Sequence, residues 1–183
     1  MRHQINQRTA SSVARMNAYD RRLAAIHEAG HALIAVYLGY RADAWVHPNE
    51  TDEPLAEKTW LGHVAVHDRP RSCAHPHSRM IAIAGMVAEI LWKHGHDDEY
   101  GEPYGWEDHL FDEDCMSFSD WRNADCEPGQ PDEDLFDVVA EVARLFMGDY
   151  WPILTDMSRT LMGDTESIYT FRPPTVRDRK EAA

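Results

Sequence analysis

The sequence IHEAGHALIAV occupies residues 26–36 and contains the pattern His-Glu-x-x-His at His27, Glu28 and His31. Residues 18–38 around it are rich in Ala and Leu, which predicts a helix rather than a strand. Asn17, with Asp20 three residues later, can cap the start of this helix, and Gly39 can stop it. We therefore expect the pattern to lie within one well-formed helix.

Helical geometry places His27 and His31 about 40° apart on one face of that helix, so both imidazoles can bind one ion. Glu28 is offset by about 60° from His31, which puts its carboxylate beside the open side of the metal. Zinc lowers the pKa of a bound water to about 7, and a neighbouring carboxylate can take its proton as the hydroxide attacks a carbonyl. The pattern predicts Zn²⁺ as cofactor and Glu28 as general base, although two core or surface histidines that bind no metal are an alternative.

Gly30 lies inside the predicted helix, where glycine costs about 1 kcal/mol relative to alanine. We expect it to make room for a close neighbour. A catalytic zinc site also needs a third protein ligand. Residues 32–42 contain no His or Glu, so this ligand must come from farther along the chain.

Alternating and periodic patterns predict a small sheet followed by helices. The predicted strands are residues 43–47 and 59–67, and the predicted helices are residues 78–93, 118–124, 133–147 and 150–162. We expect a flexible N-terminal segment at residues 1–16, a single domain at residues 17–165 and a C-terminal tail at residues 166–183. This order of elements favours an α+β fold in which the sheet packs on the helix with the His-Glu-x-x-His pattern.

Composition narrows the range of functions. The 183 residues suffice for one domain, and a net charge of −14 disfavours nucleic acid and anionic lipid as partners. No stretch approaches the roughly 20 apolar residues of a membrane span. Three cysteines and no visible secretory signal predict reduced thiols and a cytoplasmic protein.

Four segments in order resemble the peptidase domain of the FtsH-type AAA proteases. They are IHEAGHALIAV at residues 26–36, WLGHVAV at residues 60–66, IAIAGMVAEIL at residues 81–91 and SDWRNA at residues 119–124. The resemblance implies a zincin-like, mainly helical zinc metallopeptidase domain, here standing alone without ATPase or membrane segments. It assigns Asp120 as the third zinc ligand and Glu89 as a contact to a ligand histidine.

The residues alone leave alternatives to both assignments. Ser117 and Asp120 also form a helix-capping pair, and Glu89 could form a simple salt bridge. The substitutes for Asp120 as ligand are Asp108, His109, Asp112 and Asp114. Residues 97–114 carry nine acidic residues and predict a solvated loop, with a lid or a calcium-binding loop as alternatives.

The remaining histidines and cysteines have weaker functional interpretations. Cys73, His75 and His77 could form a second metal site, but an exposed turn is the simpler interpretation. His63 and His67 share one face of a predicted strand and could line the cleft. Cys115 and Cys126 are expected to be unpaired thiols.

Together these features predict a metallopeptidase that is ATP-independent in isolation and acts on peptide or protein substrates with flexible or unfolded segments. The strand at residues 59–67 could bind an extended peptide as an added strand. A homo-oligomer or a separate unfoldase partner is compatible with the resemblance. The alternatives are a non-catalytic metal-binding adaptor and a regulatory peptidase that cuts one basic partner.

Overall fold

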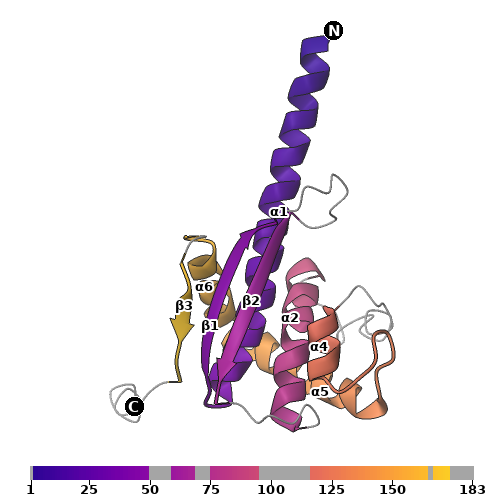
Figure 1. The fold of residues 1–183 in the computed structure, drawn as a ribbon, viewed down its shortest axis with the longest axis vertical. Helices are drawn as coiled ribbons and strands as arrows, with labels where there is room; N and C mark the ends of the chain where they lie inside the picture. Colours follow the sequence, from indigo (N-terminus) through magenta and orange to yellow (C-terminus); the bar gives the residue numbers. More distant parts are fainter. Residues whose placement is uncertain (1, 50–58, 69–74, 95–115, 165–166, 174–183) are drawn as a thin grey trace.

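The computed structural model describes residues 2–49, 59–68, 75–94, 116–164 and 167–173, with side chains from residue 16 onward. It has an α+β architecture in which a small antiparallel sheet covers one side of a long helix and further helices cover another (Figure 1). The predicted α+β class is therefore confirmed. Among the described helices, none has both the length and the apolar content to cross a membrane.

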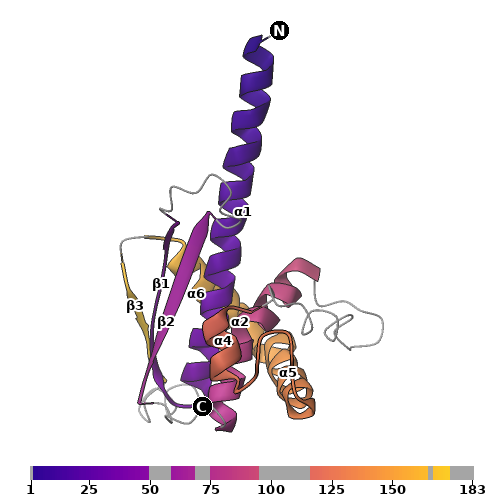
Figure 2. The same cartoon turned by 45° about the vertical axis from the view of Figure 1, so that its right-hand side comes forward.

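The first helix, α1 (Arg2–Tyr37), is the longest element of the fold. Its C-terminal half lies between the sheet and α2, whereas its N-terminal half extends beyond the other described elements in both views (Figures 1 and 2). The sequence predicted a start near residue 18, but the helix begins at Arg2. Residues 2–16 contain neither Gly nor Pro to interrupt it, and their polar, aperiodic pattern fits a segment that no described element covers.

The sheet contains β1 (Arg41–Pro48), β2 (Trp60–His67) and β3 (Tyr169–Phe171) in the order β2-β1-β3. Ala42, Ala44 and Val46 of β1 are buried against α1, and the alternate residues lie on the opposite face. Both predicted strands are confirmed. The third was not predicted, because its three residues fall within the segment assigned to the tail.

Helix α2 (Pro76–His94) packs against α1, and Gly30 lies at their contact. A Cβ atom at Gly30 would lie 2.5 Å from the carbonyl oxygen of Ala84 and 2.9 Å from the Cβ of Ala88. The absence of a side chain therefore lets the two helices approach closely, which confirms that Gly30 makes room for a neighbour.

The other helices complete the core. They are α4 (Phe118–Asn123), α5 (Glu133–Leu145), the π-helical turn η2 (Phe146–Tyr150) and α6 (Trp151–Leu161), which agrees with the predicted helical segments. Trp121, Phe146 and Leu154 are buried beneath them. Helix α4 lies beside α2, which brings Asp120 close to the C-terminal half of α1 (Figure 2).

Candidate metal centre

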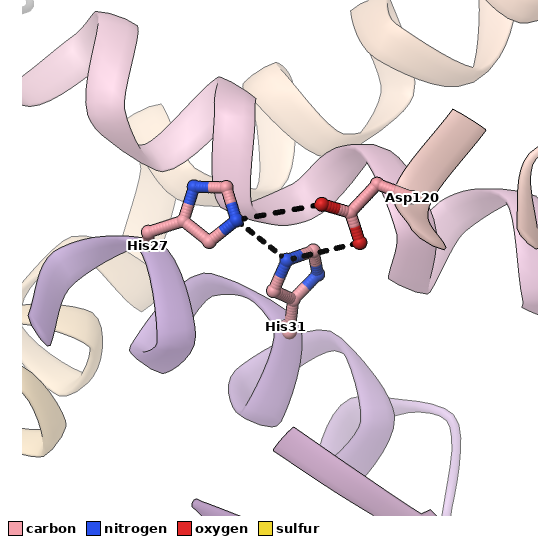
Figure 3. Close-up of side chains that lie close together, drawn as sticks. All are labelled: His27, His31 and Asp120. Carbon is pink, nitrogen blue, oxygen red and sulfur yellow. Dashed lines mark hydrogen bonds and ion pairs between the residues drawn. The ribbon is translucent and has the colours of Figure 1, made fainter. Parts of the chain in front are cut away.

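Two side chains of α1, His27 and His31, point toward each other one helical turn apart (Figure 3). The Nδ1 atom of His31 lies 2.5 Å from the carbonyl oxygen of Ile81, and the Nδ1 atom of His27 lies 2.7 Å from Oε1 of Glu89. Both partners lie on α2, so this helix sets the orientation of both rings. The Nε2 atoms are left facing the space between the rings, 2.9 Å apart.

Asp120 brings a carboxylate to the same space from α4 (Figure 3). Its Oδ2 lies 3.7 Å from Nε2 of His27, and its Oδ1 lies 3.7 Å from Nε2 of His31. Ser117 caps the start of α4, and its hydroxyl donates a 2.6 Å hydrogen bond to Oδ2 of Asp120. Asp120 therefore belongs to the capping box of α4 and also faces the two histidines, so its two interpretations do not exclude each other.

The three side chains form a group that could hold a metal ion, with ligand atoms within 4.8 Å of one another. A carbonyl oxygen can only accept, so Nδ1 of His31 carries the ring proton and its Nε2 presents a lone pair. The carboxylate of Glu89 favours the same tautomer in His27. Two lone pairs at 2.9 Å beside a carboxylate would repel one another, so this space favours a cation, which is either a metal ion or the proton that His27 binds in the metal-free protein.

The separations also suit a tetrahedral ion. Ligands at about 2.0–2.1 Å from a tetrahedral metal lie roughly 3.3 Å from one another. The observed separations of 2.9 and 3.7 Å lie on either side of this value. Two imidazole nitrogens and one carboxylate oxygen are also a common ligand set of catalytic zinc sites.

Two glycines that the sequence did not single out leave space at this centre. A Cβ atom at Gly85 of α2 would lie 2.5 Å from Nε2 of both His27 and His31. A Cβ atom at Gly62 of β2 would lie 2.3 Å from Cγ of Glu28. The signal that could have identified Gly85 is the one used for Gly30, since a glycine inside an apolar helix costs about 1 kcal/mol.

The electrostatics of the centre follow from these contacts. Burial lowers the pKa of His27, but the carboxylates of Asp120 and Glu89 outweigh burial and raise it well above 6.5. Burial and the neighbouring His27 lower the pKa of His31, although the charge of Asp120 opposes them. Burial raises the pKa of Glu89, but hydrogen bonding and attraction to His27 bring it down to about 2. Burial also raises the pKa of Asp120, but several interactions outweigh burial and hold this pKa well below its usual range. The largest of them is the attraction to the charge of His31.

Glu28 lies beside this group and is only 7% exposed. Its side chain packs against the backbone of Gly62, and its negative charge contributes to the raised pKa of His27. The carboxylate therefore lies against β2 and near enough to His27 to affect its protonation.

A cleft of about 780 Å³ contains all four of these side chains. All of β2, from Trp60 to His67, lines one wall, and residues of α1, α2 and α4 line the rest. His63 and His67 therefore line the cleft together with the rest of β2, which is the alternative that the sequence left open for them. The structure thus brings His27, Glu28, His31, Glu89 and Asp120 together at one site.

The other candidate residues lie elsewhere. His77 bonds through Nδ1 to the hydroxyl of Tyr40 at 2.7 Å, and its ring contacts His75 edge to face. Cys126 is a free thiol. The predictions for Cys73, Cys115 and residues 97–114, which include Asp108, His109, Asp112 and Asp114, lie outside the described residues.

Neither the models of known protein families nor the curated proteins contain a match to this chain.

Proposed function

We propose that the chain is a zinc-dependent metallopeptidase that hydrolyses peptide bonds in flexible or unfolded protein segments. The observation that carries this proposal is the convergence of His27, His31 and Asp120, with Glu28 beside them, in one cleft bordered by a strand. A site that only held a metal would gain nothing from a buried carboxylate beside the ligands. Hydrolysis requires such a group.

The zinc would be held by His27, His31 and Asp120. The spacing of the two histidines on one helix is typical of zincin-like metallopeptidases, which supports this proposal. When bound, zinc would polarise the carbonyl to be cleaved and acidify water at the site. Glu89 and the carbonyl oxygen of Ile81 keep both rings oriented with Nε2 inward.

Glu28 would act as the general base. Its carboxylate is buried beside Gly62 in the cleft that the histidines also line, so it could accept a proton from the attacking water and return it to the leaving amine. Gly62 leaves space for this side chain, and the cleft reaches both groups. The peptide bond to be cleaved would therefore lie opposite Gly62.

The strand β2 offers a main-chain template for the substrate. In the part of the chain that the structure describes, only β1 pairs with it. The N–H of Asn49 donates to the carbonyl oxygen of Thr59, so this pair is hydrogen bonded. Along an antiparallel ladder, hydrogen-bonded pairs of residues alternate with pairs that are not hydrogen bonded. Pro48 has no N–H to donate, and it accordingly falls in a pair that is not hydrogen bonded, opposite Trp60.

This alternation directs the N–H and C=O groups of Gly62 and Val64 away from β1, toward the cleft. An extended peptide could pair with them as an added strand, which supplies affinity without requiring a particular sequence. We expect a host peptide that is N-methylated at alternate residues to lose about 10-fold or more in kcat/KM, since each lost main-chain bond is worth about 1 kcal/mol. Equal cleavage of the methylated and unmethylated peptides would discard the added strand but not the zinc chemistry.

The decisive experiment compares the wild type with Glu28→Gln on a denatured protein substrate and measures zinc content for both. We expect Glu28→Gln to keep its zinc and to lose about 10²- to 10⁴-fold in kcat/KM. Glu141→Gln, an exposed position on α5, is the matched control and should behave as the wild type. Equal cleavage by wild type and Glu28→Gln would remove the mechanism, and bound zinc with no cleavage by either would favour the non-catalytic adaptor.

A further inference from the structure

The face of the sheet that points away from α1 carries a row of three rings. The ring centroids of Trp45 and His63 are 5.4 Å apart, and those of His47 and His63 are 5.7 Å apart with nearly parallel planes. Trp45 and His47 lie on the central strand β1, and Trp45 is the direct partner of His63 across the ladder. Both rings of β1 therefore contact His63, which is the member of this row that lies on β2, the outer strand of the described sheet.

His63 is both exposed and part of the wall of the cleft. Its neighbour along β2 is Gly62, where the proposed general base Glu28 packs. A residue of an added strand opposite His63 would thus be adjacent to the residue at the bond to be cleaved. Its side chain would project on the same face as the ring row, because side chains alternate between the two faces of a sheet.

We propose that His63 selects an aromatic side chain in the substrate next to the cleaved bond. The inference rests on the proposed function and specifies its substrate class as extended segments that contain Phe, Tyr or Trp. In such a complex the substrate ring extends the row formed by Trp45, His47 and His63.

Cross-strand geometry supports this contact. Side chains directly opposite each other in a sheet have Cβ atoms about 4.5–5.5 Å apart, and aromatic pairs at such positions are favourable. The rings of His63 and His47 are already stacked within 15° of parallel, so the row has a defined orientation before a substrate binds. A preorganised surface loses less entropy when it binds a rigid ring.

The charges around the cleft argue against an acidic side chain as the preferred one. Asp20, Glu28, Glu89 and Asp120 line the cleft, and no described residue of its wall is Lys or Arg. The whole chain carries a net charge of −14. An uncharged ring gains from stacking without this repulsion.

The test uses zinc-loaded Glu28→Gln, which should bind peptides without cleaving them. Fluorescent host peptides of alternating Thr and Ala carry Phe, Leu or Arg at one central position, and Kd is measured for each. We expect the Phe peptide to bind about 3- to 10-fold more tightly than the Leu peptide. In wild-type digests of denatured proteins, aromatic residues should be enriched at one position next to the cut.

When His63→Thr is added to Glu28→Gln, the affinity of the Phe peptide relative to the Leu peptide should fall toward one while the zinc content stays the same. When His63→Phe is added instead, this affinity ratio should return. The matched control is His67→Thr on the same face of β2, whose ring bonds to Asp43 at 2.7 Å, and it should keep the ratio. The proposal is overturned if Phe and Leu bind equally, if Arg binds most tightly, or if the ratio survives His63→Thr. It is also overturned if neither peptide binds.

The two proposals can fail separately. Cleavage by the wild type without an aromatic preference would keep the peptidase and reject the role of His63. A Phe-to-Leu ratio that depends on His63, in a wild type that cleaves nothing, would keep the binding site and reject the peptidase.

Discussion

The two sides of the candidate metal centre are held in different ways. His27 and His31 lie on the 36-residue α1, and their Nδ1 atoms bond to residues of the 19-residue α2 that are 62 and 50 positions away in sequence. Asp120 lies on the six-residue α4, and its side chain bonds to Ser117, three residues earlier. The side-chain orientation of the histidines therefore depends on bonds between two long helices, whereas that of Asp120 depends on hydrogen bonds within one local turn.

Among the variants that test this contrast, Gly85→Ala should have the largest effect. The new methyl group would lie 2.5 Å from Nε2 of both histidines, so the rings must turn away from their common centre. We expect zinc affinity to fall by at least about 100-fold, more than the loss of a supporting hydrogen bond would cause. Competition with a chromogenic chelator measures this affinity.

Gly30→Ala on the facing helix is the control for Gly85→Ala. Its methyl group would meet the backbone oxygen of Ala84 at 2.5 Å, and a backbone moves less easily than the end of a side chain. We expect the free energy of unfolding of the metal-free protein to fall by about 1–3 kcal/mol. If Gly85→Ala instead retained zinc and lost only stability, the space beside the histidines would serve packing and not a metal.

Glu89→Gln tests the histidine side by removing the charge that orients His27. The substitution keeps the shape of the side chain, and we expect zinc affinity to fall by about 10- to 100-fold. Lys93→Gln removes only the 3.1 Å contact between Lys93 and the outer oxygen of Glu89, and should change affinity by about 2-fold. Equal losses in the two variants would show that general charge, rather than the bond to His27, supports the metal.

The same variant should change how zinc binding depends on pH. Glu89 helps to raise the pKa of His27 above 6.5, so His27 keeps its proton to a higher pH and zinc must displace it. Without that charge the pH of half-maximal loading should fall, even though the maximal affinity is lower. In the metal-free wild type, a raised pKa stabilises the fold fully below pH 6.5, and this contribution is lost as the pH rises through the folded-state pKa of His27.

The contrast also explains which features the sequence could predict. The one-turn spacing of His27 and His31 is a local property of a helix, and the alternation of β1 and β2 is a local property of strands. Gly85 contacts residues more than 50 positions earlier, and β3 pairs with a strand more than 120 positions earlier, which no local pattern reports.

Asp120 shows the same limit. The spacing of Ser117 and Asp120 predicted the capping box correctly. It did not choose between Asp120 and the other candidate ligands, which were Asp108, His109, Asp112 and Asp114. Only the resemblance to the FtsH-type peptidase domain selected it. Its approach to the histidines depends on the packing of α4 beside α2, where Trp121 is buried.

The smallest predicted effect concerns Ser117→Ala, which acts on the aspartate side. The substitution removes the hydroxyl that bonds to Asp120 and caps α4, so we expect the free energy of unfolding to fall by about 0.5–2 kcal/mol. Zinc affinity should fall by only about 2- to 10-fold, because the backbone N–H of Ser117 still lies 3.3 Å from Oδ2 of Asp120. Calorimetry of the metal-free protein and chelator competition measure the two quantities.

Ser119→Ala is the matched control, since Ser119 bonds to the Ser117 hydroxyl and has no described bond to Asp120. It should leave both quantities nearly unchanged. A loss of zinc affinity in Ser117→Ala as large as that in Glu89→Gln would contradict the contrast between the two sides. It would mean that one turn of a six-residue helix positions the metal as strongly as the contact between α1 and α2 does, and that the orientation of the histidines alone does not determine affinity.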